Sequence, residues 1–460
     1  MAACTSDSDC RNAEGYVCDA VWKVCTLPGM AAPRAPACPA AKPLPRTAFG
    51  KVSQISTATG PGDYHFEPAA ALTRNGDLVA VYIANRLRGG KNPVQPNPLG
   101  VSNVRASGVV EGDRELTSAR RNHFDPWMAR DRQGTLYAVW LGFDLGPPER
   151  NMQIGLATSQ DGKSWTAPVD AFDPADCPDN TPGCFDKPMV AVGPDKANPK
   201  RDVVYVLYFS EPGGGLKMTT SRDGGKSFGK SILVGESAYA DVEVDERGDV
   251  HVVATTADPR RGPFGDPEGS VTYVRSSDGG ATVTQPARIS AEDELIPFFF
   301  SNPQIVSDTR RKTLYVVYPA GTPDTAWDIM LATSKDDGAT WTRIKINDDE
   351  HCANHMTPSA VLDARTGKVH VIWTENRGGA GQVAYTVCEP GGARCSANQA
   401  VSDKPFATYS FVRHSPKWQG EYNSVLIDPA RRKLHVVWTQ TVLENDKPRA
   451  RIFHTSAQLR

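Results

Sequence analysis

A short turn motif recurs four times along the chain. It runs Ser, any residue, Asp, two or three turn residues with Gly, and then Ser or Thr before a final side chain that is aromatic in three copies. The copies occupy residues 159–165, 221–228, 276–283 and 334–341. Asp and Ser side chains bond nearby backbone and Gly supplies a positive φ, so the motif predicts a tight hairpin whose last residue packs onto a sheet.

A longer repeat surrounds this motif. Each unit begins at an anchor residue, usually Pro, and continues with an apolar stretch, an Asp, a turn and a strand that ends in an aromatic residue. The anchors are Pro68, Pro126, Pro188, Ala240, Pro303, Pro358 and Asn423. Successive anchors lie 52 to 65 residues apart, which is enough for one four-stranded blade each. The sequence therefore predicts an all-β fold, a seven-bladed β-propeller of four-stranded antiparallel blades over residues 47–460.

The ends of the repeat region predict how the ring closes. The last unit stops after its third strand, at residues 451–455, and an unassigned strand at 49–56 precedes the first anchor. We expect this N-terminal strand to complete the C-terminal blade, because closure leaves no large unpaired edge.

The four turn motifs resemble the Asp-box, or bacterial neuraminidase repeat, of sialidase-like β-propellers. The resemblance covers most of residues 47–460. In that family the box lies on the periphery, away from the active site. The resemblance thus implies structural roles for Asp161, Asp223, Asp278 and Asp336.

The chain departs from the sialidases at their catalytic signature. Sialidases have six blades and use an arginine triad, a Tyr/Glu nucleophile pair and an Asp acid. Their first arginine lies in a Phe-Arg-Ile-Pro motif at the start of an inner strand. The matching stretch here is His65-Phe66-Glu67-Pro68, with Phe66 in place of the arginine. A sialidase-like fold without the sialidase site is expected.

Ten cysteines indicate an oxidising compartment, and hence a secreted, periplasmic or cell-surface protein, with a lipid anchor on Cys4 as a minor alternative. Residues 1–25 hold Cys4, Cys10, Cys18 and Cys25 and are too few to form a core, so disulfides of open pairing should hold this segment together. Residues 26–46 are rich in Pro and Ala and are expected to be a linker.

Two further cysteine pairs have a clear place in the repeats. Cys177 and Cys184 flank a Pro-Asp-Asn-Thr-Pro-Gly loop and should close it. Cys388 and Cys395 lie where the sixth blade should carry its turn motif, so a disulfide is expected to replace that turn. Cys38 and Cys352 remain, and their pairing stays open.

The charge of the whole chain limits its partners. Its 51 basic and 53 acidic residues give a net charge of −2, which supports neither nucleic-acid binding nor a polybasic membrane surface. No run of about 18 apolar residues occurs, so no transmembrane helix is expected. A monomer that binds an acidic glycan or another anionic small ligand is predicted.

Candidate catalytic residues lie just before the anchors, where inner strands begin nearest the propeller axis. His65 and Glu67, and likewise His123 and Asp125, stand three and one positions before their anchors. Residues two apart on a strand point to one side, so each pair is expected to face the central funnel. His355 holds the equivalent position two blades away around the ring. A His near neutral pKa beside a carboxylate suits acid–base catalysis.

Loops between the second and third strands should share the same face. They carry the predicted substrate-binding residues Arg86, Arg88, Arg260, Arg261, Trp327 and Arg377. Guanidinium groups bind carboxylates and sulfates through two parallel hydrogen bonds, so these arginines favour an acidic ligand.

Three functions are compatible with these residues. The first is a secreted carbohydrate-active enzyme, a glycosidase or lyase, with a His/carboxylate site that acts on an acidic glycan. The second is a metal-dependent enzyme in which His65, His123 and His355, with Glu67 or Asp125, hold Cu, Fe or Zn. The third is a non-catalytic propeller that binds a glycan or a protein.

Overall fold

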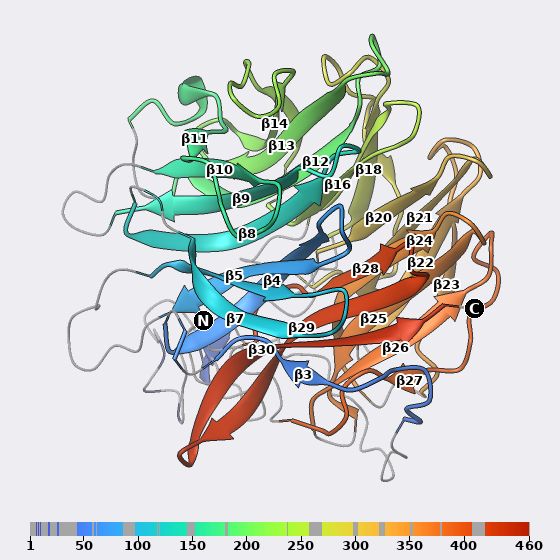
Figure 1. Cartoon of the computed structure of the whole chain (residues 1–460). Coiled ribbons are helices and arrows are strands. Elements are labelled where there is room, and N and C mark those ends of the chain that lie inside the picture. The colour runs from blue at the N-terminus through green and yellow to red at the C-terminus, as the bar shows by residue number, and fades with distance from the viewer. Residues whose placement is uncertain are drawn as a thin grey trace.

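The computed structural model describes most of the propeller. The described residues are 44–57, 59–60, 62–85, 97–116, 118, 120–144, 152–179, 183–236, 238–256, 269–297, 302–321, 327–349, 353–377, 380–406 and 419–459, with 6, 8, 10, 17–18 and 25–26 near the N-terminus. Seven four-stranded antiparallel sheets follow one another around a ring (Figure 1). The predicted seven-bladed all-β propeller is confirmed.

The strands of the blades follow the chain in order. Blade 1 contains β4 (Tyr64–Leu72), β5 (Leu78–Asn85), β6 (Leu99–Val104) and β7 (Val110–Leu116); blade 2 contains β8 (Asn122–Arg130), β9 (Leu136–Phe143), β10 (Gln153–Ser159) and β11 (Val169–Asp170). Blade 3 contains β12 (Phe185–Pro194), β13 (Asp202–Ser210), β14 (Gly215–Ser221) and β15 (Ile232–Gly235), and a short 3-10 helix (Pro174–Asp176) precedes it. Blade 4 contains β16 (Ala240–Val244), β17 (Val250–Thr255), β18 (Val271–Ser276) and β19 (Ala287–Arg288).

The remaining blades repeat this plan. Blade 5 contains β20 (Gln304–Asp308), β21 (Thr313–Ala320), β22 (Asp328–Ser334) and β23 (Thr342–Lys345); blade 6 contains β24 (His355–Asp363), β25 (Lys368–Glu375), β26 (Gln382–Cys388) and β27 (Gln399–Ala400). Blade 7 contains β28 (Ser424–Asp428), β29 (Lys433–Glu444), β30 (Lys447–Gln458) and the N-terminal strand β3 (Ser53–Gln54). Every first strand contacts the first strand of the next blade, and β28 contacts β4, so the first strands line the axis.

The N-terminal strand closes the ring as predicted. In β3, Ser53 lies opposite His454 of β30 and Gln54 lies opposite Phe453. Phe49 adds an isolated bridge to Ala457. Seen in Figure 1, β3 lies along the outer side of β30, so the two ends of the repeat region share one sheet.

Four of the axial strands carry a β-bulge just before their anchor proline. The ladder register shifts there in β4, β8, β12 and β24. The residue before the proline adopts a left-handed backbone with φ of 56° at Glu67, 49° at Asp125, 46° at Lys187 and 52° at Thr357. This conformation is unusual for residues with a side chain, and for a residue that precedes proline. A bulge also re-aims a side chain, so the simple two-residue alternation fails at these positions.

The four motif aspartates lie in hairpins between third and fourth strands. Each one accepts hydrogen bonds from backbone N–H groups of its own turn. The turns pack on the preceding blade: a Cβ on Gly338 would lie 2.1 Å from the Tyr273 ring, and one on Gly280 would lie 2.9 Å from the Tyr205 ring. Antiparallel connections place these hairpins at the opposite end of the blades from the starts of the axial strands.

The cysteine predictions for the propeller are confirmed where the structure describes them. Cys177 bonds Cys184, and Cys388 bonds Cys395 across the sixth hairpin. Near the N-terminus a short antiparallel pair joins β1 (Val17–Cys18) to β2 (Cys25–Thr26), and Cys10 and Cys18 are disulfide-bonded. Cys4, Cys38, Cys352 and most of the predicted linker at 26–46 lie outside the described residues. Within the described ranges, no helix is long and apolar enough to cross a membrane.

Candidate functional site

A cavity of about 230 Å³ opens where the axial strands of blades 1, 2, 3 and 7 begin. Its walls combine apolar side chains, three of them phenylalanines, with four carboxylates and one ammonium group. The lining residues are Phe66, Glu67, Ile83, Phe124, Asp125, Leu141, Phe143, Asp186, Lys187 and Glu421. The starts of the axial strands therefore do meet at a common hole, and carboxylates dominate its polar lining.

Lys187 is the centre of the polar side of this cavity. Its Nζ lies 2.8 Å from Asp125 Oδ1 and also pairs with Glu421, while only 5% of its side chain is exposed. Burial alone would lower the pKa of Lys187, but the carboxylates of Asp125, Glu421 and Glu67 raise that pKa well above its ordinary value. The lysine is therefore charged, and it is the cation that these three carboxyl groups share.

Glu421 completes the cluster from the far side of the ring. Its Oε2 accepts a hydrogen bond of 3.1 Å from the hydroxyl of Tyr239, which belongs to blade 4. The neighbouring Gly420 has a φ of 82°, and a Cβ there would lie 2.2 Å from Glu67 Cγ. Glycine is thus required for Glu67 to approach, because any side chain at this position would displace the carboxylate.

Tyrosine rings close the cluster beneath the ammonium. Lys187 Nζ lies 5.5 Å from the Tyr239 ring centroid and 5.9 Å from that of Tyr422, distances at which a cation is attracted to an aromatic face. The Tyr422 hydroxyl donates to the carbonyl oxygen of Pro126 at 3.0 Å. These contacts tie blades 3, 4, 7 and 2 together across the axis and fix the ammonium in place.

The structure brings Glu67 and Asp125 together but separates them from their predicted histidine partners. His65 Nδ1 contacts Ser56 Oγ at 2.8 Å, and His123 donates from Nδ1 to the Asn97 carbonyl at 2.9 Å. Neither histidine lines the cavity. The expectation that each His and its carboxylate face one space is therefore wrong, because the bulge before the anchor proline turns the carboxylate toward the axis and leaves the histidine between blades.

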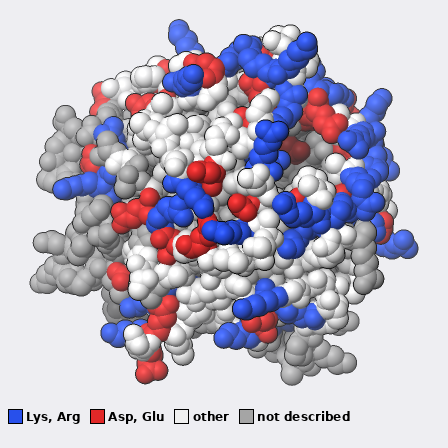
Figure 2. Space-filling model, viewed as in Figure 1, with Lys and Arg blue, Asp and Glu red and all other residues white. Residues whose placement is uncertain are grey.

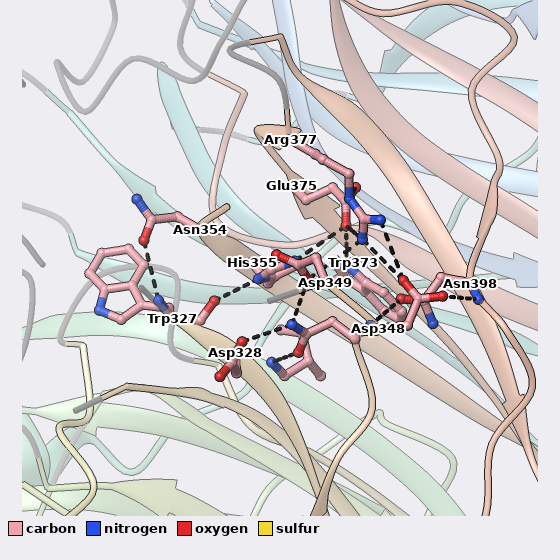
Figure 3. A network of polar contacts seen from close by, with 12 residues as sticks. Trp327, Asp328, Asp348, Asp349, Asn354, His355, Trp373, Glu375, Arg377 and Asn398 are labelled. Atoms are coloured by element: carbon pink, nitrogen blue, oxygen red, sulfur yellow. Dashed lines mark hydrogen bonds and ion pairs between the residues drawn. The ribbon is translucent and has the colours of Figure 1, made fainter. Parts of the chain in front are cut away.

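His355 belongs to a separate ion network between blades 5 and 6 (Figure 3). It is fully buried; its Nδ1 donates to the Trp327 carbonyl at 2.7 Å, and its Nε2 lies 3.0 Å from Asp349 and 3.4 Å from Glu375. Burial alone would lower the pKa of His355, but the two carboxylates raise it to about 10. This histidine is a permanent cation near neutral pH, which suits an interblade clamp and does not suit a proton shuttle.

The predicted ligand-binding residues that the structure describes are part of the same network or of the core. Arg377 Nε lies 2.9 Å from Glu375 Oε1, and 8% of the Arg377 side chain is exposed. Trp327 is 1% exposed. Neither lines the cavity, contrary to the prediction, because their carboxylate and core partners hold both side chains inside the blades. Arg86, Arg88, Arg260 and Arg261 lie outside the described residues.

The metal hypothesis depended on three histidines meeting at the axis. The structure instead gives each histidine its own partner: His65 contacts Ser56, His123 contacts Asn97 and His355 contacts Asp349. Among the described residues, no group of three or more His, Cys, Asp or Glu side chains is arranged to hold a metal ion. The predicted histidine set therefore does not form a metal site here.

Two of the central residues escaped the sequence prediction. Lys187 occupies the same position as Glu67 and Asp125, directly before an anchor proline, and could have been found by following that position around the ring. Glu421 stands two positions before the weakest anchor, Asn423, so its repeat position gave no signal. The Gly before Glu421 is the local feature that could have indicated a close approach.

Fold and site together define the class: a seven-bladed β-propeller with a lysine–carboxylate cluster at one end of its axis. No protein-family model and no curated protein matches the chain. Among solved structures it is similar to a Dyadobacter fermentans protein of unknown function, at 12% identity and a TM-score of 0.49, over 89% of this chain and 99% of the other.

Two glycosidase structures show similar levels of likeness. The Hadza microbial sialidase Hz136 matches at 17% identity and a TM-score of 0.43, over 67% of this chain and 63% of the other. The Penicillium chrysogenum α-L-arabinanase in complex with arabinobiose matches at 13% identity and a TM-score of 0.44, over 89% and 98%. These likenesses describe overall shape, and the activity of this chain has to be argued from its own site.

Proposed function

We propose that this chain is a glycoside hydrolase whose catalytic carboxylates are Asp125 and Glu421. The observation that carries the proposal is that both carboxylates contact one buried ammonium group at an aromatic-walled cavity. Since each bonded oxygen lies within 2.8 Å of Lys187 Nζ, the two oxygens are at most about 5.6 Å apart, twice that distance. For these two oxygens the limit excludes the roughly 6.5–9.5 Å separation of inverting glycosidases and is compatible with the roughly 5–5.5 Å of retaining ones.

The environments of the two carboxylates support different roles. Glu421 is 1% exposed and receives Lys187 and the Tyr239 hydroxyl, so its ionised form is stabilised, as a nucleophile or charge stabiliser requires. Asp125 is 9% exposed and lines the cavity; as the acid–base residue it would have to bind a proton in place of its ion pair with Lys187, give that proton to the glycosidic oxygen and later take one from water. Two carboxylates in unlike surroundings are the usual basis for separate acid and nucleophile roles.

Backbone strain at the same residues supports a functional site. Glu67, Asp125 and Lys187 all hold left-handed backbones. Such conformations cost about 1–3 kcal/mol each and are retained mainly where the surrounding structure requires the resulting side-chain position. At all three positions the result is a charged group directed at the cavity.

The charge of the cavity favours a neutral sugar. Its described lining carries four carboxylates and only Lys187 as a cation, and that cation is engaged by Asp125 and Glu421. Phe66, Phe124 and Phe143 offer apolar faces to a sugar ring. An acidic glycan, as the sequence suggested, would need cations from elsewhere; the four predicted loop arginines outside the described residues are the candidates. The disulfides support an oxidising compartment outside the cytosol.

Activity screening with paired variants tests this proposal. Wild-type protein is assayed on neutral aryl glycosides and on neutral and acidic polysaccharides, beside Asp125→Asn, Glu421→Gln and the exposed control Glu292→Gln. We expect turnover of a neutral substrate, loss of at least about 100-fold in kcat in each cluster variant, and no loss in the control. Full activity in both cluster variants would refute the assignment. Glycan binding without turnover by wild-type protein would refute catalysis and leave a binding propeller.

A further inference from the structure

The loops that join first and second strands lie at the end of the propeller opposite the cavity. They comprise residues 73–77, 131–135, 195–201, 245–249, 309–312, 364–367 and 429–432. All seven carry at least one exposed Lys or Arg, and Arg74, Arg132, Lys200, Arg247, Arg310, Arg365 and Arg431 represent the seven blades in order. We call these seven loops the basic ring.

The basic ring is continuous because each loop contacts the next. Arg132 of blade 2 donates to Asp202 beside the blade 3 loop at 2.6 Å, and Arg432 of blade 7 donates to Asp363 beside the blade 6 loop at 2.8 Å. The blade 1 and blade 7 loops also touch, since a Cβ on Gly76 would lie 2.0 Å from the guanidinium of Arg431. The remaining junctions are closed in the same way. The cations therefore stand on one rigid circle around the axis.

Acidic partners in these loops are buried while the cations are exposed. Exposure of the side chains is 0% for Asp245 against 37% for Arg247, and 4% for Asp428 against 44% for Arg431. The buried aspartates accept hydrogen bonds from their own loop backbones. Glu246, with 62% of its side chain exposed, is the acidic exception. Solvent that meets these seven loops therefore meets mainly guanidinium and ammonium groups, while the motif hairpins at the same end carry exposed aspartates, of which Asp337 pairs with Arg247. Figure 2 shows Lys and Arg side chains gathered, with some Asp and Glu among them, on the side where Figure 1 marks the C-terminus.

The other exposed residues of these loops decide between kinds of polyanion. Beside the cations and Glu246 they are Asn, Gln, Ala and Pro. Base recognition in single strands uses aromatic stacking, and membrane docking uses long apolar side chains beside the cations. The loops present cations and amide side chains beside small Ala and Pro residues, with no exposed aromatic or long apolar side chain, which suits sulfate or carboxylate groups on a hydrophilic chain.

We propose that the basic ring binds an acidic polysaccharide that carries sulfate or uronate groups. This surface lies at the other end of the axis from the cavity and does not depend on the catalytic proposal. The ring would attach the protein to an anionic matrix while the cavity remains accessible. Fixed guanidinium groups recognise such oxyanions at low entropic cost, and the affinity should fall steeply with salt.

A charge-removal experiment on the two faces tests the ring. Arg74, Lys200 and Lys312 are exposed cations of the ring, and all three are changed to Gln in one variant. The matched control changes Arg121, Lys404 and Lys447 to Gln, three exposed cations at the cavity end. Both variants lose three positive charges, so they differ only in the face affected. Binding of fluorescent dextran sulfate, polygalacturonate and neutral dextran is measured by fluorescence anisotropy. The salt concentration is varied over about 50–200 mM, because electrostatic binding to polyanions weakens over this range.

We expect wild-type protein and the control to bind both acidic polymers but not neutral dextran. The ring variant should bind dextran sulfate about tenfold more weakly and with a shallower salt dependence. Equal weakening in the control, or no binding of either polymer by wild-type protein, would overturn the proposal. Tighter binding to phosphatidylglycerol vesicles or to a single-stranded oligonucleotide would also overturn it. Unchanged melting temperatures exclude unfolding, and glycosidase activity on neutral substrates should be the same in all three proteins.

Discussion

Substitution of Lys187 by Met tests the axial cluster most directly. Methionine keeps the length and apolar stem of lysine but removes the ammonium group. Three carboxylates, those of Asp125, Glu421 and Glu67, then lose the charge that acts on them. We expect the folded protein to become markedly less stable at neutral pH, since a buried ion cluster with one sign removed is left with uncompensated charge.

The size of the effect follows from the geometry. At 2.8 Å and an effective dielectric constant of about 20, the attraction between Lys187 and Asp125 alone is about 6 kcal/mol. Desolvation of a side chain that is 5% exposed offsets part of this attraction. Broken buried pairs typically cost about 3–5 kcal/mol. The entropy of unfolding is about 2.1 cal/mol/K per residue, summed over the roughly 410 residues of the ring. Dividing the lost stability by this entropy gives a fall in melting temperature of about 4–6 °C.

Thermal melts at pH 7 and pH 4 measure this effect, beside an exposed control, Lys404→Met. At pH 4 the freed carboxylates of the variant can take up protons, so the difference from wild type should shrink. A fall of less than 1 °C at pH 7, or an equal fall at both pH values, would contradict the view that Lys187 balances a buried carboxylate cluster. The control should melt within about 1 °C of wild type.

Three further predictions concern the blades. The pKa of His355 is raised from 6.5 to about 10, so its protonated ring stabilises the fold fully below pH 6.5, and this stabilisation is lost as pH rises through 10. The difference in melting temperature between wild type and His355→Gln should therefore narrow from pH 6 to pH 10. Gly338→Ala should destabilise by more than Gly183→Ala in urea melts, because both have positive φ but only the first Cβ would clash with a neighbouring ring, adding about 1–3 kcal/mol. Replacing Cys388 and Cys395 by serines should lower the free energy of unfolding in urea melts by about 2.5 kcal/mol, the value expected for a disulfide that closes a short loop. An unchanged free energy would show that the hairpin does not need the disulfide.

Blade number, ring closure and two disulfides were predictable from the sequence. Each rests on features that recur or lie close in the chain: anchors at similar spacing, a leftover strand before Pro68, and cysteines seven residues apart. A repeat averages out local noise, because one blade can only bury its faces against like neighbours. The fold was therefore determined many times over.

The site was only half predictable. Position before the anchor selected Glu67 and Asp125, which line the cavity, but pairing with His65 and His123 assumed a regular strand. The bulge and left-handed backbone at these residues leave no mark in the sequence beyond a following proline, which usually disfavours that conformation. Because the bulge redirects these side chains, the cavity is lined by a lysine and carboxylates and not by the predicted histidines.

Net charge concealed the second surface. A value of −2 for the whole chain gave no reason to expect a cationic face. The structure separates the signs by depth, since aspartates such as Asp245 and Asp428 turn inward to bond their loops while arginines stay outside. Charge counts cannot report this separation, although a buried aspartate before an exposed cation recurs in six of the seven blades, with Thr73 in its place in blade 1.

The sharing of one sheet by β3 and β30 has a consequence for biogenesis. A nascent chain leaves the ribosome with β3 already made, yet the strand it needs is among the last to emerge. Six blades can assemble beforehand, but β3 cannot pair with β30 and close the ring until translation is nearly finished. A proteolytic cut near Ser53 would detach β3 from the rest of the chain. Blade 7 would then lose its fourth strand, and the ring of seven blades would no longer be closed by the N-terminal segment.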